Sequence, residues 1–141
     1  MHPKKLVAML ALLAVARVRA GDFSGTEALA FTKHLVSFGP RPSGSDAIRA
    51  AQKYILSELK TIGCQITQDD FSGSTPLGRT PMKNIIARFP GESGKVVVIT
   101  GHYDTKSMPG TFFVGANDGG ASAGFLLEMA NALAHGLDLV S

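Results

Sequence analysis

The residues best suited to chemistry are His102 and Asp104, in the motif Gly101-His102-Tyr103-Asp104 that follows the apolar run at residues 96–99. That run is a continuous β-branched stretch, typical of a strand buried on both faces, and the carboxyl end of such a strand is a usual ligand crevice. Residues two apart on a strand point the same way. We therefore expect Asp104 to hold the far nitrogen of the His102 ring, as is common around metal-bound imidazole. A simple His–Asp pair at a strand end is the alternative.

Asp118 is the second candidate, because it stands directly before an expected helix with glycines on both sides. Those glycines permit unusual backbone angles and close approach to a bound group. Aspartate is also favoured at a helix N-cap, so a purely capping role is an alternative for Asp118. With His102 and Asp104 it would form a hard nitrogen and oxygen ligand set of the zinc type. These residues are therefore the candidates for a zinc site, and the simple His–Asp pair and the N-cap stay open as alternatives.

Two helices are expected before these motifs. Residues 26–38 have apolar positions at helical spacing, and the sequence Gly39-Pro40-Arg41-Pro42 ends that helix because proline cannot continue it. A second helix has Ser43 and Ser45 as candidate caps and Gly63 as its stop. Its amphipathic stripe consists of Ile48, Ala51, Ile55, Leu59 and Ile62.

Strands are expected on the remaining positions. Residues 64–71 alternate as a strand does, residues 72–81 are punctuated by glycine and proline and predict a loop, and residues 84–89 predict the next strand. Residues 101–120 predict a long glycine-rich loop, and residues 121–135 a helix with Phe125, Leu126, Met129 and Leu133 on one side. Strands mixed with packed helices predict an α/β sandwich.

The first twenty residues are typical of a secretory signal peptide. A positively charged start is followed by an apolar run at residues 6–16 and by small residues at Val18 and Ala20. The run is too short to span a bilayer, which takes about 20 apolar residues. We expect residues 1–20 to be removed, giving a secreted or periplasmic product without stable membrane association. An uncleaved anchor is the alternative.

The charge balance argues against nucleic acid as a partner. Four of the 14 lysines and arginines lie in the first twenty residues, so the remaining 121 residues carry 10 basic and 11 acidic side chains. A nucleic-acid-binding protein would keep a basic face after processing. With 45% apolar residues in the whole sequence, the composition is that of a globular protein, and about 120 residues after the first twenty predict a single domain. Cys64 is the only cysteine in the sequence, so no disulfide can form within it.

Taken together, the motifs resemble those of the co-catalytic zinc aminopeptidases and their relatives, the glutaminyl cyclases. The resemblance rests on four segments, which are Arg41-Pro42-Ser43-Gly44-Ser45, Asn84-Ile85-Ile86-Ala87, Gly101-His102-Tyr103-Asp104 and Gly115-Ala116-Asn117-Asp118. Three further features are more similar to the cyclase branch, which are Thr75-Pro76-Leu77-Gly78, Lys106 and Phe113-Val114-Gly115-Ala116.

The resemblance implies a mixed-sheet α/β/α sandwich of the zinc-exopeptidase type, incomplete at the C-terminus. Residues 21–141 would be the N-terminal part of a single catalytic domain. In the aminopeptidases, the residue matching His102 ligates one zinc, the match to Asp118 bridges two zincs, and the match to Asp104 supports the histidine. In the animal-type cyclases a single zinc is kept. There the match to Asp118 is a ligand and the match to His102 is not.

The resemblance also implies an exported zinc enzyme whose substrates are peptide or protein N-termini. Glutaminyl-peptide cyclotransferase activity, which forms pyroglutamate from N-terminal glutamine, is favoured. A metallo-aminopeptidase is the alternative, and a non-catalytic binding or relic domain is the second. The family's Glu-Glu pair has no match after Asp118, since Glu128 falls inside the expected helix. We therefore assign no catalytic residue here and expect an inactive N-terminal fragment of a longer protein.

Overall fold

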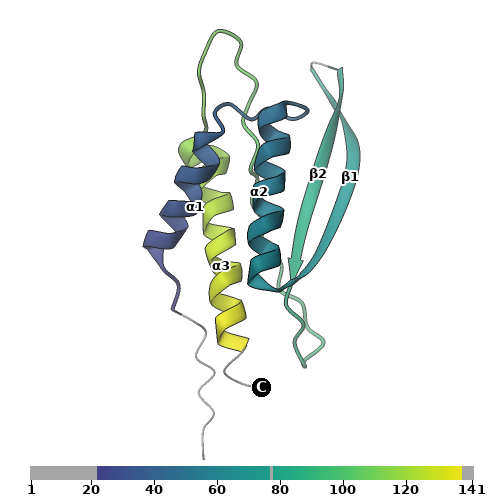
Figure 1. The fold of residues 1–141 in the computed structure, drawn as a ribbon. Helices are drawn as coiled ribbons and strands as arrows, with labels where there is room; N and C mark the ends of the chain where they lie inside the picture. The colour runs from purple at the N-terminus through teal and green to yellow at the C-terminus, as the bar shows by residue number, and fades with distance from the viewer. Residues whose placement is uncertain (1–21, 77, 138–141) are drawn as a thin grey trace, which may run out of the picture.

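The computed structural model describes residues 22–76 and 78–137, which form three α-helices and one β-hairpin (Figure 1). The signal peptide expected at residues 1–20 lies outside this part of the chain. The elements in chain order are α1 (Gly25–Ser37), α2 (Asp46–Ile62), β1 (Gln65–Thr75), β2 (Gly78–Arg88), a short π-helical turn η1 (Ala116–Gly120) and α3 (Ala121–Leu137). In Figure 1, α3 lies between α1 and α2, and the hairpin lies beside α2. Within the described ranges, no helix has the length and apolar character needed to cross a membrane.

Helices α1 and α2 begin and end close to the positions predicted from the sequence. The Ser24 side chain caps α1 by accepting a hydrogen bond from the backbone N–H of Glu27 at 3.2 Å. The Ser45 side chain caps α2 by accepting from the N–H of Ile48 at 3.1 Å. Gly63 ends α2 with φ of +85°, the left-handed conformation that glycine adopts readily. The predicted capping serine and stop glycine of α2 are therefore confirmed.

The core lies where the three helices meet. The predicted stripe of α2 is buried apart from the half-buried Ile62. The buried core cluster consists of Leu35, Ala51, Ile55, Leu59, Ala123, Leu127 and Ala130. The small residues of α3 let α1 approach closely. A Cβ atom added at Gly124 would lie 2.7 Å from the carbonyl oxygen of Ala28.

The buried face of α3 differs from the predicted one. Phe125 and Leu133 were expected to share the apolar side, yet each is 41% exposed, while Ala123, Leu127 and Ala130 face the core. The contact with α1 selects this face, because Gly124 lets the two helices approach closely. Apolar character alone did not identify the packed side.

Strands β1 and β2 form an antiparallel hairpin that continues through the loop predicted at residues 72–81. Their register runs from Gln65 opposite Arg88 to Thr75 opposite Gly78. Pro81 lies within β2, opposite Ser72. The loop prediction was wrong because each strand of a two-stranded sheet has an open edge, and proline is tolerated on edge strands. The inner side of the hairpin packs against the helical core through Ile66, Ile85 and Ala87.

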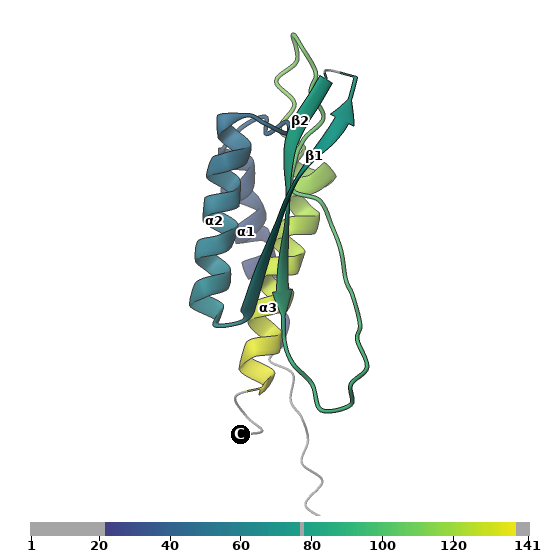
Figure 2. The same cartoon turned by 90° about the vertical axis from the view of Figure 1, so that its right-hand side faces the viewer.

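Residues 96–99 do not form the buried strand predicted for them. No strand is assigned there, and Val96, Val97, Val98 and Ile99 are 75, 87, 75 and 52% exposed. Figure 2 shows the chain leaving the end of β2, turning, and returning along the outside of the molecule. A strand buried on both faces needs neighbours on both sides, and the described residues supply none. The prediction therefore fails through missing partners and not through the residue types.

Candidate metal centre

The segment at residues 101–105 is held against the start of α3. A Cβ atom added at Gly101 would lie 2.9 Å from the Cβ of Ser122, so only glycine permits this approach. The Ser122 hydroxyl donates to the carbonyl oxygen of His102 at 2.7 Å and lies 3.1 Å from that of Gly119. One serine in the first turn of α3 thereby links the segment that carries His102 to the turn that carries Asp118.

The backbone around Asp118 has the special conformations that its flanking glycines predict. Gly115 and Gly119 have φ of +55° and +90°, and Asp118 itself is extended, with φ of −97° and ψ of 99°. A Cβ atom added at Gly119 would lie 2.5 Å from the carbonyl oxygen of Asp104 and 3.1 Å from the Nδ1 atom of His102. Close contact between the two segments therefore requires glycine at position 119.

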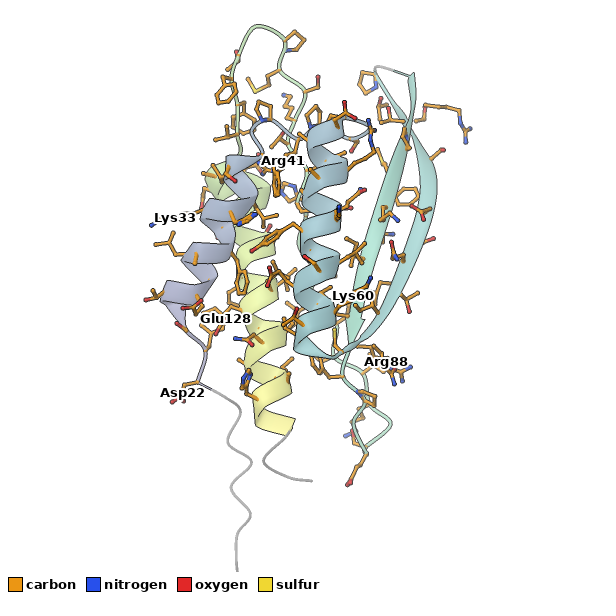
Figure 3. The ribbon with its side chains drawn as sticks, viewed as in Figure 1. Asp22, Lys33, Arg41, Lys60, Arg88 and Glu128 are labelled. Atoms are coloured by element: carbon orange, nitrogen blue, oxygen red, sulfur yellow. The ribbon has the colours of Figure 1, made fainter. Side chains whose placement is uncertain are left out.

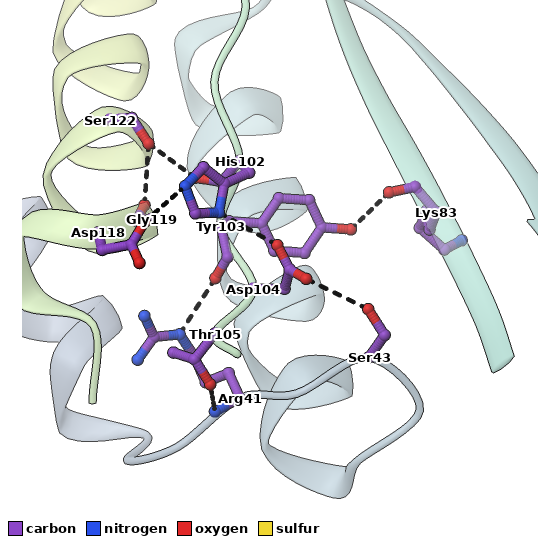
Figure 4. Close-up of polar contacts among 10 residues, drawn as sticks. All are labelled: Arg41, Ser43, Lys83, His102, Tyr103, Asp104, Thr105, Asp118, Gly119 and Ser122. Carbon is purple, nitrogen blue, oxygen red and sulfur yellow. Dashed lines mark hydrogen bonds and ion pairs between the residues drawn. The ribbon is translucent and has the colours of Figure 1, made fainter. Parts of the chain in front are cut away.

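The structure brings together the three residues that the sequence singled out (Figure 4). The Nδ1 atom of His102 lies 3.2 Å from Oδ1 of Asp104, and its Nε2 atom lies 3.0 Å from Oδ1 of Asp118. The hydroxyl of Ser43 donates to Oδ2 of Asp104 at 3.3 Å. Among the described residues, no backbone N–H donates to the Asp118 carboxylate, so the capping alternative gains no support. The role of these residues as metal ligands stays a prediction.

The donor atoms present fit part of a zinc site. One imidazole nitrogen and one carboxylate oxygen face each other, and both are donor types that zinc accepts. The side chains of His102 and Asp118 are 54 and 63% exposed, so the site is open to solvent. A catalytic zinc is held by three protein ligands. Within residues 22–76 and 78–137 no group of three or more metal-ligating side chains is placed to hold an ion.

Tyr103 points to the opposite side of the segment and anchors it to the hairpin. Its hydroxyl donates to the carbonyl oxygen of Lys83 at 2.7 Å and accepts from Nε2 of Gln52 at 3.1 Å. Burial raises the pKa of Tyr103, the hydrogen bond from Gln52 lowers it, and the negative charge of Asp104 raises it. Tyr103 was not singled out from the sequence, although its place between His102 and Asp104 predicts that it points away from both.

A pocket of about 160 Å³ adjoins His102 between α2, the hairpin and this segment. Six of its lining residues are Ser43, Gln52, Phe71, Met82, His102 and Tyr103. The pocket mixes aromatic and polar groups and opens beside the imidazole.

Three titratable residues outside the site, His34, Glu128 and Cys64, take part in packing or in hydrogen bonds within the fold. His34 stacks on the Tyr54 ring, with centroids 3.9 Å apart and planes at 5°. Glu128 is buried and accepts from the backbone N–H of Ser24 at 2.9 Å and from Nδ2 of Asn131 at 3.2 Å. Cys64 is a free thiol whose pKa is raised by burial. None of these groups lies at the His102–Asp118 pair.

The sequence is similar to one protein family and to several known proteins. Residues 84–139 match the model of Peptidase family M28. A glutaminyl-peptide cyclotransferase-like protein of Bos taurus is 33% identical over 97 residues, which cover 66% of this chain and 25% of that protein. The glutaminyl-peptide cyclotransferase of Gloydius blomhoffii is 34% identical over 103 residues, covering 70% and 28%. The chain thus spans about a quarter of the length of these relatives.

Solved structures support the same assignment. A Zn-dependent exopeptidase from Parabacteroides distasonis matches with a TM-score of 0.73 and 32% identity, over 82% of this chain and 43% of that one. The glutaminyl cyclase of an Acidobacteriales bacterium matches with a TM-score of 0.74 and 35% identity, over 80% and 40%. The fold class and the resemblance are therefore confirmed: the chain carries the fold of the zinc exopeptidase and glutaminyl cyclase superfamily, and its relatives include the glutaminyl cyclase branch.

Proposed function

We propose that residues 21–141 form the N-terminal part of the catalytic domain of an exported zinc enzyme that converts the N-terminal glutamine of peptides to pyroglutamate. The observation that carries the zinc site is the opposed pair of His102 Nε2 and Asp118 Oδ1, 3.0 Å apart. The relatives support the choice of cyclisation, since they include a glutaminyl-peptide cyclotransferase and a glutaminyl-peptide cyclotransferase-like protein.

Each residue of the site has a distinct task in this proposal. Asp104 accepts the Nδ1 proton of His102, which leaves Nε2 turned toward Asp118. Ser43 donates to the second oxygen of Asp104 and so fixes the carboxylate plane. Asp118 supplies the anionic ligand from its extended backbone position. Zinc bound here would supply Lewis-acid polarisation of the glutamine γ-amide carbonyl.

Cyclisation also needs a group that moves a proton from the α-amine to the departing ammonia. The amine and the amide belong to one residue, so orientation contributes much of the rate enhancement. Glu128 does not suit the proton transfer, because it is buried and already accepts hydrogen bonds from the Ser24 backbone and the Asn131 side chain. We assign this group and the remaining zinc ligands to sequence beyond residue 141, and we expect that residues 1–141 alone do not turn over substrate.

Metallo-aminopeptidase activity is the second candidate function. It is favoured by the match to a leucine aminopeptidase precursor from Bacteroides thetaiotaomicron, with a TM-score of 0.75 and 26% identity over 82% of this chain and 43% of that one. A non-catalytic binding domain is the third candidate, since the exposed apolar residues 96–99 would suit a covering partner.

The first experiment reads the coding DNA through and beyond codon 141. An open frame with a Glu-Glu pair and a later histidine supports the proposal. A stop with no such sequence nearby contradicts the catalytic function for this molecule.

The second experiment measures zinc and activity in the complete gene product. Plasma mass spectrometry is expected to find one zinc per chain in the wild type and in Asp69→Ala, a control on the exposed side of the hairpin. Asp118→Ala is expected to lose the zinc. Retained stoichiometric zinc in Asp118→Ala contradicts the site assignment. Two zincs, with release of N-terminal residues and no cyclisation of a glutaminyl peptide, would favour the aminopeptidase.

Export is proposed from the first twenty residues alone. Expression with the native N-terminus is expected to give a product in the periplasm or medium that begins at Gly21. An intact Met1 on a membrane-bound product would show the uncleaved anchor instead.

A further inference from the structure

Arg41 is a fully buried cation in the connection between α1 and α2 (Figure 3). Its side chain donates to three carbonyl oxygens from separate places in the chain. Nε donates to Tyr103 at 3.2 Å, and Nη1 donates to Gly39 at 2.8 Å and to Val114 at 3.0 Å. The guanidinium therefore joins the segment that carries His102 to the loop that leads to Asp118.

The backbone of Arg41 adds a second attachment to the same segment. Its N–H donates to Oγ1 of Thr105 at 2.8 Å, and its carbonyl oxygen accepts from the N–H of Thr105 at 3.1 Å. Thr105 is itself buried. The Tyr103 carbonyl lies between His102 and Asp104 in sequence, and the Val114 carbonyl directly precedes the left-handed Gly115. Arg41 thus contacts the backbone between His102 and Asp104, and the backbone four residues before Asp118.

Burying the charge of Arg41 is energetically unfavourable, so packing alone does not explain an arginine at this position. Arg41 makes no ion pair within hydrogen-bonding range, and its Nη2 atom is buried without a partner among the described residues. Burial lowers the pKa of Arg41, and the negative charge of Asp104 raises it. A buried charge without a bonded counterion lowers stability. The planar guanidinium, however, has several donors in a fixed arrangement, and here they reach three carbonyl oxygens at once.

Arg49 provides a comparison on the next helix. It is exposed, its Nη1 atom donates to the Gly44 carbonyl at 2.7 Å, and it pairs with Asp46 within α2. Its contacts are local, whereas those of Arg41 join segments more than sixty residues apart in sequence. Arg49 is therefore a matched control for the loss of a guanidinium.

We propose that Arg41 is a positioning residue that fixes the separation of residues 101–105 from residues 114–118, and thereby keeps His102 Nε2 opposite Asp118 Oδ1. The geometric part stands on the structure alone. Its consequence for zinc affinity rests on the proposed function. Loss of the Arg41 hydrogen bonds should let the loop before Asp118 move away from residues 101–105. The helical core should stay folded, because it is built from other residues.

The geometric part is tested without metal, by long-range ¹H–¹⁵N correlation of the histidine side chains in the wild type, Arg41→Lys and Arg41→Met. Arg49→Lys and Arg49→Met are the controls, and Asp118→Asn gives the reference shifts for His102 without its carboxylate contact. We expect both Arg41 variants to move the His102 nitrogens toward the Asp118→Asn values, and the Arg49 variants to match the wild type. Wild-type His102 shifts in folded Arg41→Lys would overturn the proposal. Arg41→Lys decides the test if Arg41→Met does not fold.

The zinc part is tested by competition with a chromophoric chelator in the complete gene product. Zinc affinity is expected to fall on the order of 10- to 100-fold in Arg41→Lys, the range typical of supporting residues around metal ligands, and to stay unchanged in Arg49→Lys. Equal affinity of Arg41→Lys and the wild type overturns this consequence. A wild type that binds no zinc overturns the proposed function instead, and the shifts of His102 still decide the role of Arg41.

Discussion

The apolar stripe of α2 and the apolar residues 96–99 are alike in composition and opposite in environment. Ile48, Ala51, Ile55 and Leu59 are at most 6% exposed, whereas residues 96–99 are at least 52% exposed. Helix α2 has α3 and the hairpin to cover its stripe, and no described strand lies beside residues 96–99. Apolar residues thus favour burial, but whether they are buried depends on the elements that lie beside them.

The comparison matters for the site because the exposed segment leads directly into His102. The candidate ligand is therefore not positioned by a sheet within the described residues. It is positioned by contacts that begin just after the apolar run, through Ser122, Tyr103 and Arg41. These contacts hold the site on the packed part of the molecule, while the apolar segment that precedes it is exposed.

The largest expected difference between the two regions is in the effect of removing side-chain atoms. Leu35 is 1% exposed and lies in the core cluster, so Leu35→Ala should lower the free energy of unfolding by about 2–5 kcal/mol. Val97 is 87% exposed, so Val97→Ala should change it by less than about 0.5 kcal/mol. Urea unfolding followed by circular dichroism measures both. Equal losses would show that residues 96–99 are buried in solution, by self-association or otherwise.

A smaller effect is expected from overfilling the contact between α1 and α3. In Gly124→Ala, the new Cβ would lie 2.7 Å from the Ala28 carbonyl and 2.8 Å from the Thr32 nitrogen, so the helices must separate. Overpacking of this kind lowers stability by about 1–3 kcal/mol. Gly25→Ala is the control, because nothing lies within 4 Å of its Cβ position. A thermal midpoint of Gly124→Ala at or above that of the wild type would contradict the close crossing.

Local signals were sufficient for the ends of α2 and for the special backbone around Asp118. The capping role of Ser45 and the stop at Gly63 depend on interactions within a few residues, which spacing reveals. The hairpin tip was missed because proline and glycine at residues 72–81 also suit the open edges of a two-stranded sheet. The packed face of α3 was missed because the closeness of α1, and not hydrophobicity, selected it.

The site could be predicted in part for the same reason. His102, Asp104 and Asp118 were found from spacing along a strand and from glycines beside a helix start, and the structure brings them together. Arg41 and Ser122 were not assigned to the site. Their hydrogen bonds join segments distant in sequence, so neither periodicity nor local motif could reveal them. Arg41 and Ser122 position the site through tertiary contacts, which only the folded structure shows.

Removing the N-cap of α2 should lower the free energy of unfolding by about 1 kcal/mol. Ser45→Ala removes the oxygen that accepts from the Ile48 N–H, and loss of such a cap typically lowers stability by about that amount. Ser57→Ala is the matched control, since this exposed serine only bonds the Tyr54 carbonyl within the helix. Differential scanning calorimetry of the two variants makes the comparison. A lower midpoint for Ser57→Ala than for Ser45→Ala would be inconsistent with Ser45 as the cap.

A pH-dependent effect concerns Tyr54, which packs between His34 and Phe38 at the junction of α1 and α2. Burial, with a further contribution from the charge of Glu58, raises the pKa of Tyr54 to about 12, against about 10 for an unfolded chain. The folded state therefore holds this proton more tightly. The associated stability is complete below pH 10 and is lost as the pH rises toward 12. Tyr54→Phe keeps the ring and removes the ionisation, so its unfolding free energy should decline less than that of the wild type between pH 10 and 12. Urea titrations at these pH values measure both proteins. Equal declines of the wild type and Tyr54→Phe would show that the phenol is solvated in the folded state. The junction of α1 and α2 would then be less tightly packed than the ring contacts indicate.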